Sequence, residues 1–134
     1  MAVIDASVYV ALVNAHEREH GSSWAWFEQV KAAQEAVVAP VVLLAEVAAA
    51  LSRGVGDPVL THRVVQQLLH SSLIELTPVT KALAGRAAAI AVDHRVRGCD
   101  AIYVALAEQR GDQLVTLDRQ QLERGSAVVA VRQP

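Results

Sequence analysis

The sequence predicts a three-layer α/β/α fold, in which a parallel sheet of about five strands has helices on both faces. Short apolar runs alternate with longer helical patterns along the 134 residues, and this alternation is typical of parallel strands joined by helices. Apolar residues make up 53% of the chain but aromatic residues only 4%. The core must therefore consist of Ala, Val and Leu, which favours tightly packed helices on a Val-rich sheet. We expect one domain, residues 1–134, around one core.

The first strand is predicted at Ala2 to Ile4, directly before an acid, Asp5. An apolar run without polar alternation is typical of a strand that is covered on both faces, such as the central strand of a parallel sheet. In open α/β sheets, ligands bind beyond the carboxyl ends of the strands. We therefore expect Asp5 to lie in the functional site.

Two helices are predicted before the second strand, at residues 7–13 and 22–35. The polar segment between them, residues 16–21, is expected to be a solvated loop, although His16 and His20 have the spacing of a metal-binding pair on a helix.

The second of these helices carries aromatic residues on two faces. Trp24 and Phe27 would share one face, and Trp26 would share another with Val30. Either one set binds a partner or both contact a wide core.

Glu46 lies in an unusually apolar helix, predicted at Val41 to Leu51 after a strand at residues 36–39 that ends at Pro40. The residues three and four positions away on each side of Glu46 are apolar, and an ionised Glu in such surroundings is costly unless it is paired or binds a metal. We favour a role in metal binding or catalysis over the alternative, a buried ion pair with Arg53.

The remaining segments continue the alternation of helices and strands. Strands are predicted at residues 73–76, 113–116 and 127–131, and helices at 58–71, 82–92, 100–110 and 119–123. Asp57 is expected to cap the helix at 58–71, and Asp5, Asp100 and Asp118 each stand immediately before or at the start of a predicted helix, where the carboxylate accepts a backbone N–H. Gln121 has the capping-box spacing from Asp118. Taken singly, these acids have an ordinary explanation as helix caps.

We expect four acids to meet at one edge of the sheet, because right-handed crossovers bring the strand ends together there. They are Asp5, Glu46, Asp100 and Asp118. Four like charges in one cleft persist only if protons or cations neutralise them. Oxygen ligands without His or Cys select Mg²⁺ or Mn²⁺ over zinc, and such ions serve phosphodiester hydrolysis. Ser7 and Thr116 are candidates for hydrogen bonds to these carboxylates.

Composition excludes several classes of protein. A net charge of -2 gives no whole-surface attraction for nucleic acid, so binding would need a local basic patch. The longest apolar stretch, residues 36–45, is too short to span a membrane, and no secretory signal is expected. Cys99 is the only cysteine, and an internal disulfide is therefore impossible. We expect a cytoplasmic protein.

The segments that carry the acids resemble those of the PIN-domain ribonucleases, and most closely the VapC-type toxins of toxin–antitoxin pairs. The resemblance covers almost the whole chain. It is carried by residues 3–7 (Val-Ile-Asp-Ala-Ser), 40–51 with Leu-Ala-Glu-Val, 99–107 (Cys-Asp-Ala-Ile-Tyr-Val-Ala-Leu-Ala) and 114–118 (Leu-Val-Thr-Leu-Asp).

This resemblance implies a fold, an activity and partners. Asp5, Glu46 and Asp100 would form the acidic triad of a Mg²⁺- or Mn²⁺-dependent endoribonuclease, with Asp118 as the fourth acid. It further implies a homodimer and inhibition by a cognate antitoxin, whose peptide would lie in a groove formed by N-terminal helices and send a basic side chain into the acidic site. Residues of this chain that could line the groove are Trp24, Trp26, Phe27 and the apolar face of 41–51.

For contacts with RNA we favour Arg95 and Arg97, which immediately precede Asp100, and then Arg53 and Arg119. Two other functions remain open from the residues alone. A signalling receiver would accept a phosphoryl group on an Asp beside Mg²⁺, and a non-catalytic module would bind a structural metal and leave RNA intact.

Overall fold

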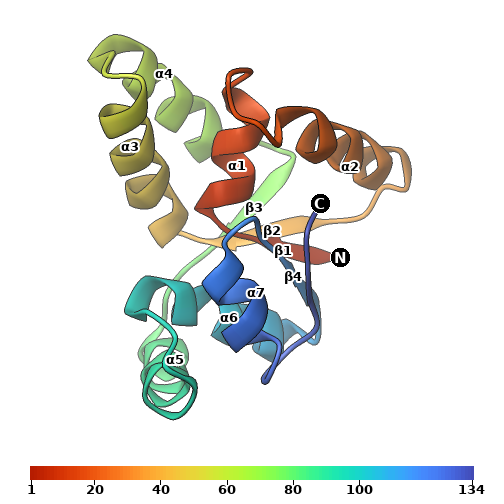
Figure 1. Cartoon of the computed structure of the whole chain (residues 1–134), viewed down its shortest axis with the longest axis vertical. Coiled ribbons are helices and arrows are strands. Elements are labelled where there is room, and N and C mark those ends of the chain that lie inside the picture. Colours follow the sequence, from red (N-terminus) through yellow and green to blue (C-terminus); the bar gives the residue numbers. More distant parts are fainter.

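Figure 1 shows the protein as a computed structural model that describes residues 1–134. Five parallel strands form one sheet in the order β3-β2-β1-β4-β5. The strands are β1 (Ala2–Ile4), β2 (Val37–Pro40), β3 (Ile74–Thr77), β4 (Gln113–Val115) and β5 (Val131–Arg132). The helices are α1 (Ala6–Val13), α2 (His20–Ala32), α3 (Val42–Gly54), α4 (Pro58–Leu69), α5 (Lys81–His94), α6 (Gly98–Arg110) and α7 (Arg119–Gly125).

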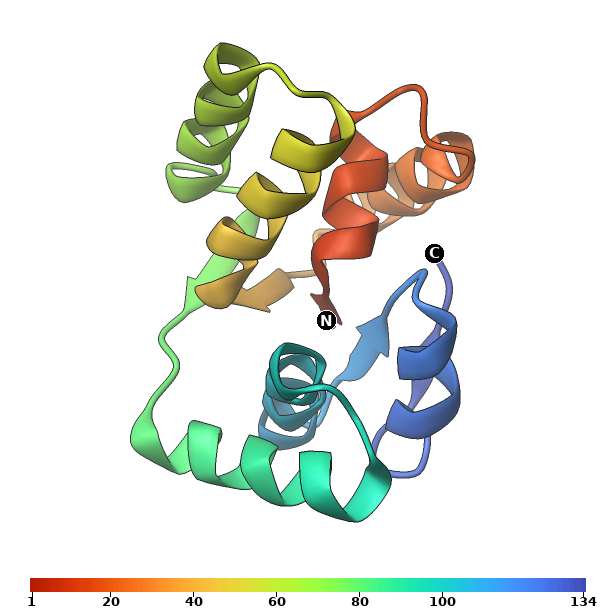
Figure 2. The same ribbon diagram turned by 60° about the vertical axis from the view of Figure 1, so that its left-hand side comes forward.

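Helices cover both faces of the sheet and give the molecule three layers (Figures 1 and 2). The helices α1 to α4 lie on one side of the sheet, and α5 to α7 lie on the other. The predicted α/β fold with a five-stranded parallel sheet is therefore confirmed. None of the helices has the length and apolar character needed to cross a membrane.

The central strand positions the first acid. β1 is hydrogen-bonded on both sides, to β2 and to β4, and its three residues are buried. Ile4 lies opposite Val115 in the parallel register. Because both strands end at this level, the next residues, Asp5 and Thr116, lie side by side at the edge of the sheet.

One correction concerns the start of α6, which begins at Gly98 rather than at Asp100. The residue at the N-cap is Arg97, with extended backbone and no capping side chain, and Asp100 lies inside the first turn. The cause is local: Arg95 ends α5 in the left-handed region (φ 56°) and Val96 inserts into the core. Asp100 is therefore not a helix cap, contrary to the prediction.

The predicted last strand, residues 127–131, is wrong for most of its length. The chain leaves α7 in a turn in which the backbone N–H groups of Val128 and Val129 donate to the carbonyl of Gly125, at 2.9 and 3.1 Å. Only Val131 and Arg132 pair with β4.

The second helix also differs from the prediction. It begins at His20, inside the segment predicted as a loop, where the His20 ring lies 2.7 Å from the carbonyl oxygen of Ala11 and stacks on Trp24. Nδ1 of His20 is therefore hydrogen-bonded to the backbone. Trp26, Phe27 and Val30 all pack in the core, whereas Trp24 is 48% exposed. The buried face is thus wider than either predicted set.

Candidate active site

Asp5 lies at the floor of the candidate site, with only 3% of its surface exposed. Its carboxylate accepts hydrogen bonds from the Ser7 hydroxyl at 2.5 Å, from the Thr116 hydroxyl, and from the backbone N–H of Val8 at 3.3 Å. The last bond caps α1, as an Asp at a helix start is expected to do. Burial nevertheless raises the pKa of Asp5 to about 6, because these hydrogen bonds offset only part of the lost hydration.

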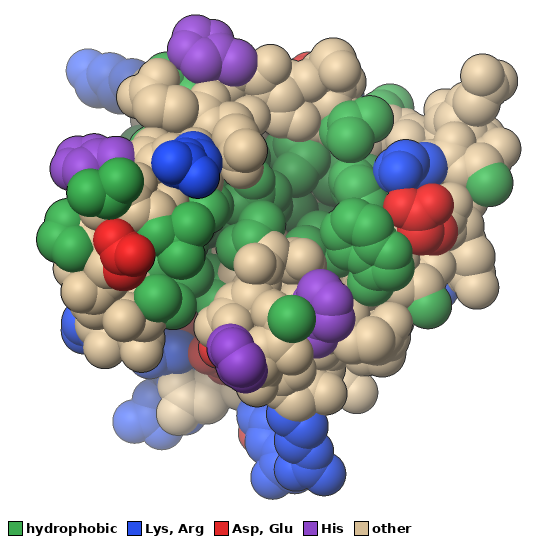
Figure 3. Space-filling view, turned by 90° about the horizontal axis from the view of Figure 1, so that it is seen from above, with side chains coloured by type: hydrophobic (Ala, Val, Ile, Leu, Met, Phe, Trp, Pro, Cys, Tyr) green, Lys and Arg blue, Asp and Glu red, His purple; other side chains and the backbone are tan.

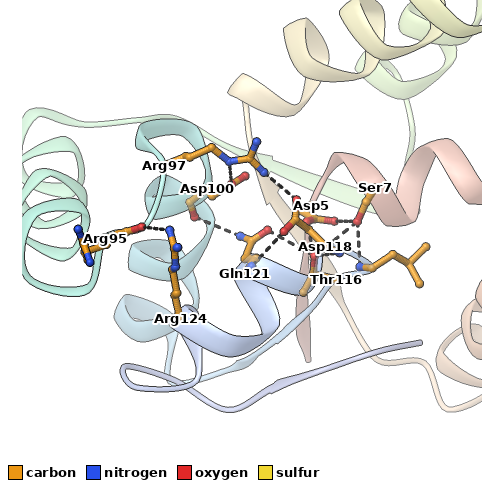
Figure 4. Close-up of polar contacts among 10 residues, drawn as sticks. Asp5, Ser7, Arg95, Arg97, Asp100, Thr116, Asp118, Gln121 and Arg124 are labelled. Carbon is orange, nitrogen blue, oxygen red and sulfur yellow. Dashed lines mark hydrogen bonds and ion pairs between the residues drawn. The ribbon is translucent and has the colours of Figure 1, made fainter.

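The two hydroxyls that bind Asp5 also join two turns that are far apart in sequence (Figure 4). Ser7 Oγ accepts the backbone N–H of Leu117 at 2.9 Å, and Thr116 Oγ1 accepts that of Asp118 at 3.0 Å. The turn after β4 is thereby fixed against the turn after β1. The structure thus places Ser7 and Thr116 where the sequence predicted them, in contact with a carboxylate.

Gln121 is a buried part of this network whose place in the site the sequence did not indicate, since it showed only the capping-box spacing from Asp118. Its backbone N–H donates to Asp118 at 3.0 Å, which is the first half of a capping box. Its side chain turns inward instead of completing that box. The Gln121 amide donates to the backbone carbonyl of Asp100 at 3.1 Å, and its oxygen lies 3.3 Å from the Thr116 hydroxyl, whose proton is donated to Asp5.

Glu46 reaches the same site from α3. One of its carboxylate oxygens, Oε1, is buried and has no hydrogen-bond partner. Burial, followed by the negative charge of Asp100, raises the pKa of Glu46. The alternative pair with Arg53 does not form, because no ion pair joins these residues.

Asp100 and Asp118 are connected by a single guanidinium group. Arg97 Nε lies 3.0 Å from Asp100 Oδ2, and Arg97 Nη2 lies 2.8 Å from Asp118 Oδ2, as Figure 4 shows. Burial raises the pKa of Asp100, and the charge of Arg97 opposes this shift. Arg97 therefore partly neutralises two of the acids.

A cleft of about 530 Å³ brings these groups together. The residues that line it are Asp5, Ala6, Ser7, Glu46, Arg97, Gly98, Cys99, Asp100, Tyr103 and Asp118. All four predicted acids are among them. The fold therefore brings together side chains from segments between the end of β1 and the start of α7.

Tyr103 is a second residue that the sequence did not indicate. It is fully buried, yet its hydroxyl has no hydrogen-bond partner. Burial and the negative charges of Glu46 and Asp5 raise its pKa, so the phenol keeps its proton and is a hydrogen-bond donor. The available signal was its position three residues after Asp100, which puts both side chains on one face of α6.

The predicted arginines have different positions. Only Arg97 lines the cleft, and it does so in ion pairs with the acids. Arg95 lies beside the cleft, next to Arg124, whose Nη1 donates to the Arg95 carbonyl at 2.6 Å. Arg53 lies on α3 about two turns beyond Glu46.

The residues of this cleft fit a hard divalent cation. The potential ligands are four carboxylates and the Cys99 thiol, and burial and the charge of Glu46 raise the pKa of that thiol. One carboxylate has an unpartnered buried oxygen, and burial disfavours the charged form of three of the four. In the metal-free arrangement, no group of three or more His, Cys, Asp or Glu side chains is placed to hold a metal ion together. Mg²⁺ does not need such a group, since it binds through one or two carboxylates and keeps several waters.

Asp5→Asn is expected to stabilise the metal-free protein at neutral pH. The folded protein holds the proton of Asp5 up to about pH 6, whereas its ordinary pKa is 3.8. The contribution of Asp5 to stability is therefore full below about pH 4 and falls as the pH rises to about 6. Asn cannot ionise but keeps only one acceptor oxygen, so we expect a gain of about 1–3 kcal/mol at pH 7.

Urea denaturation at pH 7 and pH 4 in the presence of a chelator measures this effect, and the gain should disappear at pH 4. Asp57→Asn is the matched control, because Asp57 caps α4 on the exposed surface. A D5N protein that is no more stable than the wild type at pH 7 would show that the Asp5 carboxylate is not destabilised by burial.

Comparison with known proteins identifies the family. The family model of the PIN domain matches residues 2–126. No curated protein matches the chain by sequence.

Solved structures with the same fold include several toxin proteins. The chain is similar to VapC20 of Mycobacterium tuberculosis, described as a toxin that cleaves the sarcin-ricin loop, with a TM-score of 0.80 and 21% identity over 100% of both chains. It is also similar to a chain of VapBC2 from Rickettsia felis, in a structure with a promoter DNA fragment (TM-score 0.75, 13% identity, 99% and 98% of the two chains). A toxin–antitoxin complex from Klebsiella pneumoniae gives a TM-score of 0.70 at 17% identity, over 100% and 98%.

The match of the family model over nearly the whole length, together with the acidic cleft at the carboxyl ends of the strands, leads to one conclusion: this chain belongs to the PIN-domain family.

Proposed function

We propose that this protein is a metal-dependent endoribonuclease and the toxin of a type II toxin–antitoxin pair. One observation carries the proposal: four carboxylates from four different elements line one cleft, and one buried carboxylate oxygen there has no partner. The family and the similar toxin structures support the same activity.

In this proposal Asp5, Glu46, Asp100 and Asp118 would hold Mg²⁺ or Mn²⁺ in the cleft. Such a cation would activate water and stabilise negative charge on the phosphate oxygens. The hydroxyls of Ser7 and Thr116 hold the Asp5 carboxylate in a fixed orientation.

Glu46 is the group that we propose as the proton acceptor. Its Oε1 has no partner, so it can accept a hydrogen bond and then the proton from an attacking water. Its pKa is raised by burial and by Asp100, which brings it closer to neutrality, where a general base works best.

Replacing any one of three acids should lower RNA cleavage by at least about 100-fold, the contribution typical of a positioned acid or base. The variants are Asp5→Asn, Glu46→Gln and Asp100→Asn, and the measurement is cleavage of labelled RNA at equal protein concentration. Asp57→Asn, an exposed helix cap away from the cleft, should cut at the wild-type rate. If D5N or D100N cuts as fast as the wild type, the site assignment is wrong.

Removal of divalent cations should abolish cleavage, and added Mg²⁺ or Mn²⁺ should restore it, because carboxylates alone repel a phosphate. Cleavage that continues in excess chelator would contradict metal dependence. The same assay separates the alternatives that the sequence left open. A non-catalytic module would bind Mn²⁺ without cutting RNA, and a receiver would be labelled by acetyl phosphate. Neither lysine of the chain lines the cleft, so nothing favours the receiver.

We also propose that an antitoxin peptide binds to an apolar hollow between α1, α3 and α4. Figure 3 views the molecule from the side of α1 to α4 and shows apolar side chains gathered in a hollow on this face. The structure contains there a cavity of about 210 Å³, lined by Val13, Asn14, His16, Leu51, Val55, Leu60, Thr61 and Val64. The hollow that we propose differs from the predicted groove. That groove included Trp26 and Phe27, but both side chains are buried in the core.

Leu60→Glu should weaken antitoxin binding by at least about tenfold, because it places a charge in an apolar contact. Leu60 is partly exposed at this cavity. Val92→Glu is the matched control, since Val92 is exposed on α5, on the other side of the sheet. Titration calorimetry with the purified antitoxin measures the difference, and equal affinities for the two variants would exclude this hollow.

The homodimer that the resemblance implies is part of the same proposal, and sedimentation equilibrium of the purified chain tests it. So is a cytoplasmic location, which fits the free, exposed thiol of Cys99.

A further inference from the structure

Arg97 occupies the oxygens that a cation in the cleft would use. Its guanidinium group donates from Nε to Asp100 Oδ2 at 3.0 Å and from Nη2 to Asp118 Oδ2 at 2.8 Å. The two carboxylates are largely shielded from solvent, with 16% and 29% of their side-chain surface exposed, whereas 64% of the Arg97 side chain is exposed. The arginine thus reaches the acids from the solvent side of the cleft (Figure 4).

The backbone around Arg97 is held by contacts other than these ion pairs. Val96 is buried in the core, and Arg124 Nη1 donates to the Arg95 carbonyl at 2.6 Å. The Arg97 side chain does not cap α6. The ion pairs are therefore not needed to hold this loop, and solvent around the exposed Arg97 side chain weakens both of them. The side chain can leave the acids while its backbone stays in place.

A divalent cation and a guanidinium group compete for the same carboxylate oxygens. Two positive charges within a few ångströms of each other also repel, so occupation by one disfavours the other. When the arginine is displaced, its planar fork of donors lies at the rim of the cleft, and this fork fits a phosphate as well as it fits a carboxylate.

We infer that Arg97 exchanges between two partners: it binds Asp100 and Asp118 in the metal-free protein and binds a backbone phosphate of the RNA when the cleft holds a divalent cation. The second half of this inference rests on the proposed ribonuclease function; the first half does not. In this exchange Arg97 is a positioning residue that weakens binding of the divalent cation and strengthens binding of RNA. Metal binding raises RNA affinity in part because it releases the Arg97 side chain.

Titration of the RNA-free protein with Mn²⁺, followed by calorimetry and by the electron paramagnetic resonance of free Mn²⁺, tests the competition. Arg97→Gln should bind Mn²⁺ about five- to tenfold more tightly than the wild type, since the competing ion pairs are lost. Arg86→Gln is the matched control. It breaks an exposed Arg–carboxylate pair with Glu108, at 2.7 and 2.8 Å, away from the cleft, and should bind Mn²⁺ like the wild type.

Fluorescence anisotropy with a labelled, mixed-sequence 20-nucleotide RNA tests the second partner, with Ca²⁺ as the cation and gels to verify that the RNA is intact. Addition of Ca²⁺ should tighten RNA binding by the wild type and by R86Q more than by R97Q. The slope of affinity against salt should fall by about 0.7 in R97Q, as expected for the loss of one phosphate contact with a single strand.

Each outcome decides the inference. Mn²⁺ affinity in R97Q that equals or falls below that of the wild type overturns the competition, as does the absence of Mn²⁺ binding in both proteins. RNA binding by R97Q that responds to Ca²⁺ as the wild type does overturns the exchange to phosphate. If R97Q binds Mn²⁺ more tightly than the wild type but the wild type does not cut RNA, the competition is supported and the proposed function fails.

Discussion

Repulsion between carboxylates held in one cleft is the constraint on which the rest of the site depends. The parallel register places the end of β1 beside the end of β4, so Asp5 and the turn to Asp118 must lie close together. The protein balances these charges by three separate means. Burial favours the protonated form of Asp5, although its hydroxyl donors oppose this; Asp100 and Asp118 share Arg97; and burial together with the charge of Asp100 favours the protonated form of Glu46.

These three means are distributed over the two layers of helices. Asp5 and Glu46 come from the side of α1 and α3, and neither forms an ion pair with a basic residue. Asp100 and Asp118 come from the side of α6 and α7, where Arg97 precedes the helix. The acids on the α1 and α3 side of the cleft therefore have no basic partner, whereas those on the α6 and α7 side share Arg97. A cation that enters the cleft meets no basic side chain on Asp5 and Glu46, whereas it must compete with Arg97 for Asp100 and Asp118.

Much of this arrangement was predictable because its signals are local. The apolar run before Asp5 indicated a buried central strand, and the apolar neighbours of Glu46 marked that acid as out of place. The alternation of helices and strands indicated the parallel sheet, and its five strands have the expected order of helices between them. Periodicity and end signals depend on neighbours within a few residues, and a sequence displays those directly.

The parts that the sequence did not reveal depend on contacts across the chain. Arg97 was predicted to contact RNA, but its pairing with Asp118 joins residues 21 positions apart. Gln121 looked like half of a capping box, yet its side chain binds the Asp100 carbonyl. Tyr103 was not indicated as a residue of the site. Gln121 and Tyr103 lie in helices that the sequence predicted, whereas the start of α6 next to Arg97 was predicted two residues late. In all three cases the packing of α6 against α7 and the sheet decided the surroundings of the side chain.

The same reasoning explains why a guanidinium group suits position 97 better than an ammonium group. Two carboxylates on different helices must be contacted at once, from Nε and Nη2, and a planar fork does this with little further loss of side-chain freedom. An ammonium group is a point charge that would be strongly hydrated at such an exposed position. Arg97 thus neutralises the metal-free cleft from outside without filling it, and the space of about 530 Å³ stays open to a cation and a phosphate.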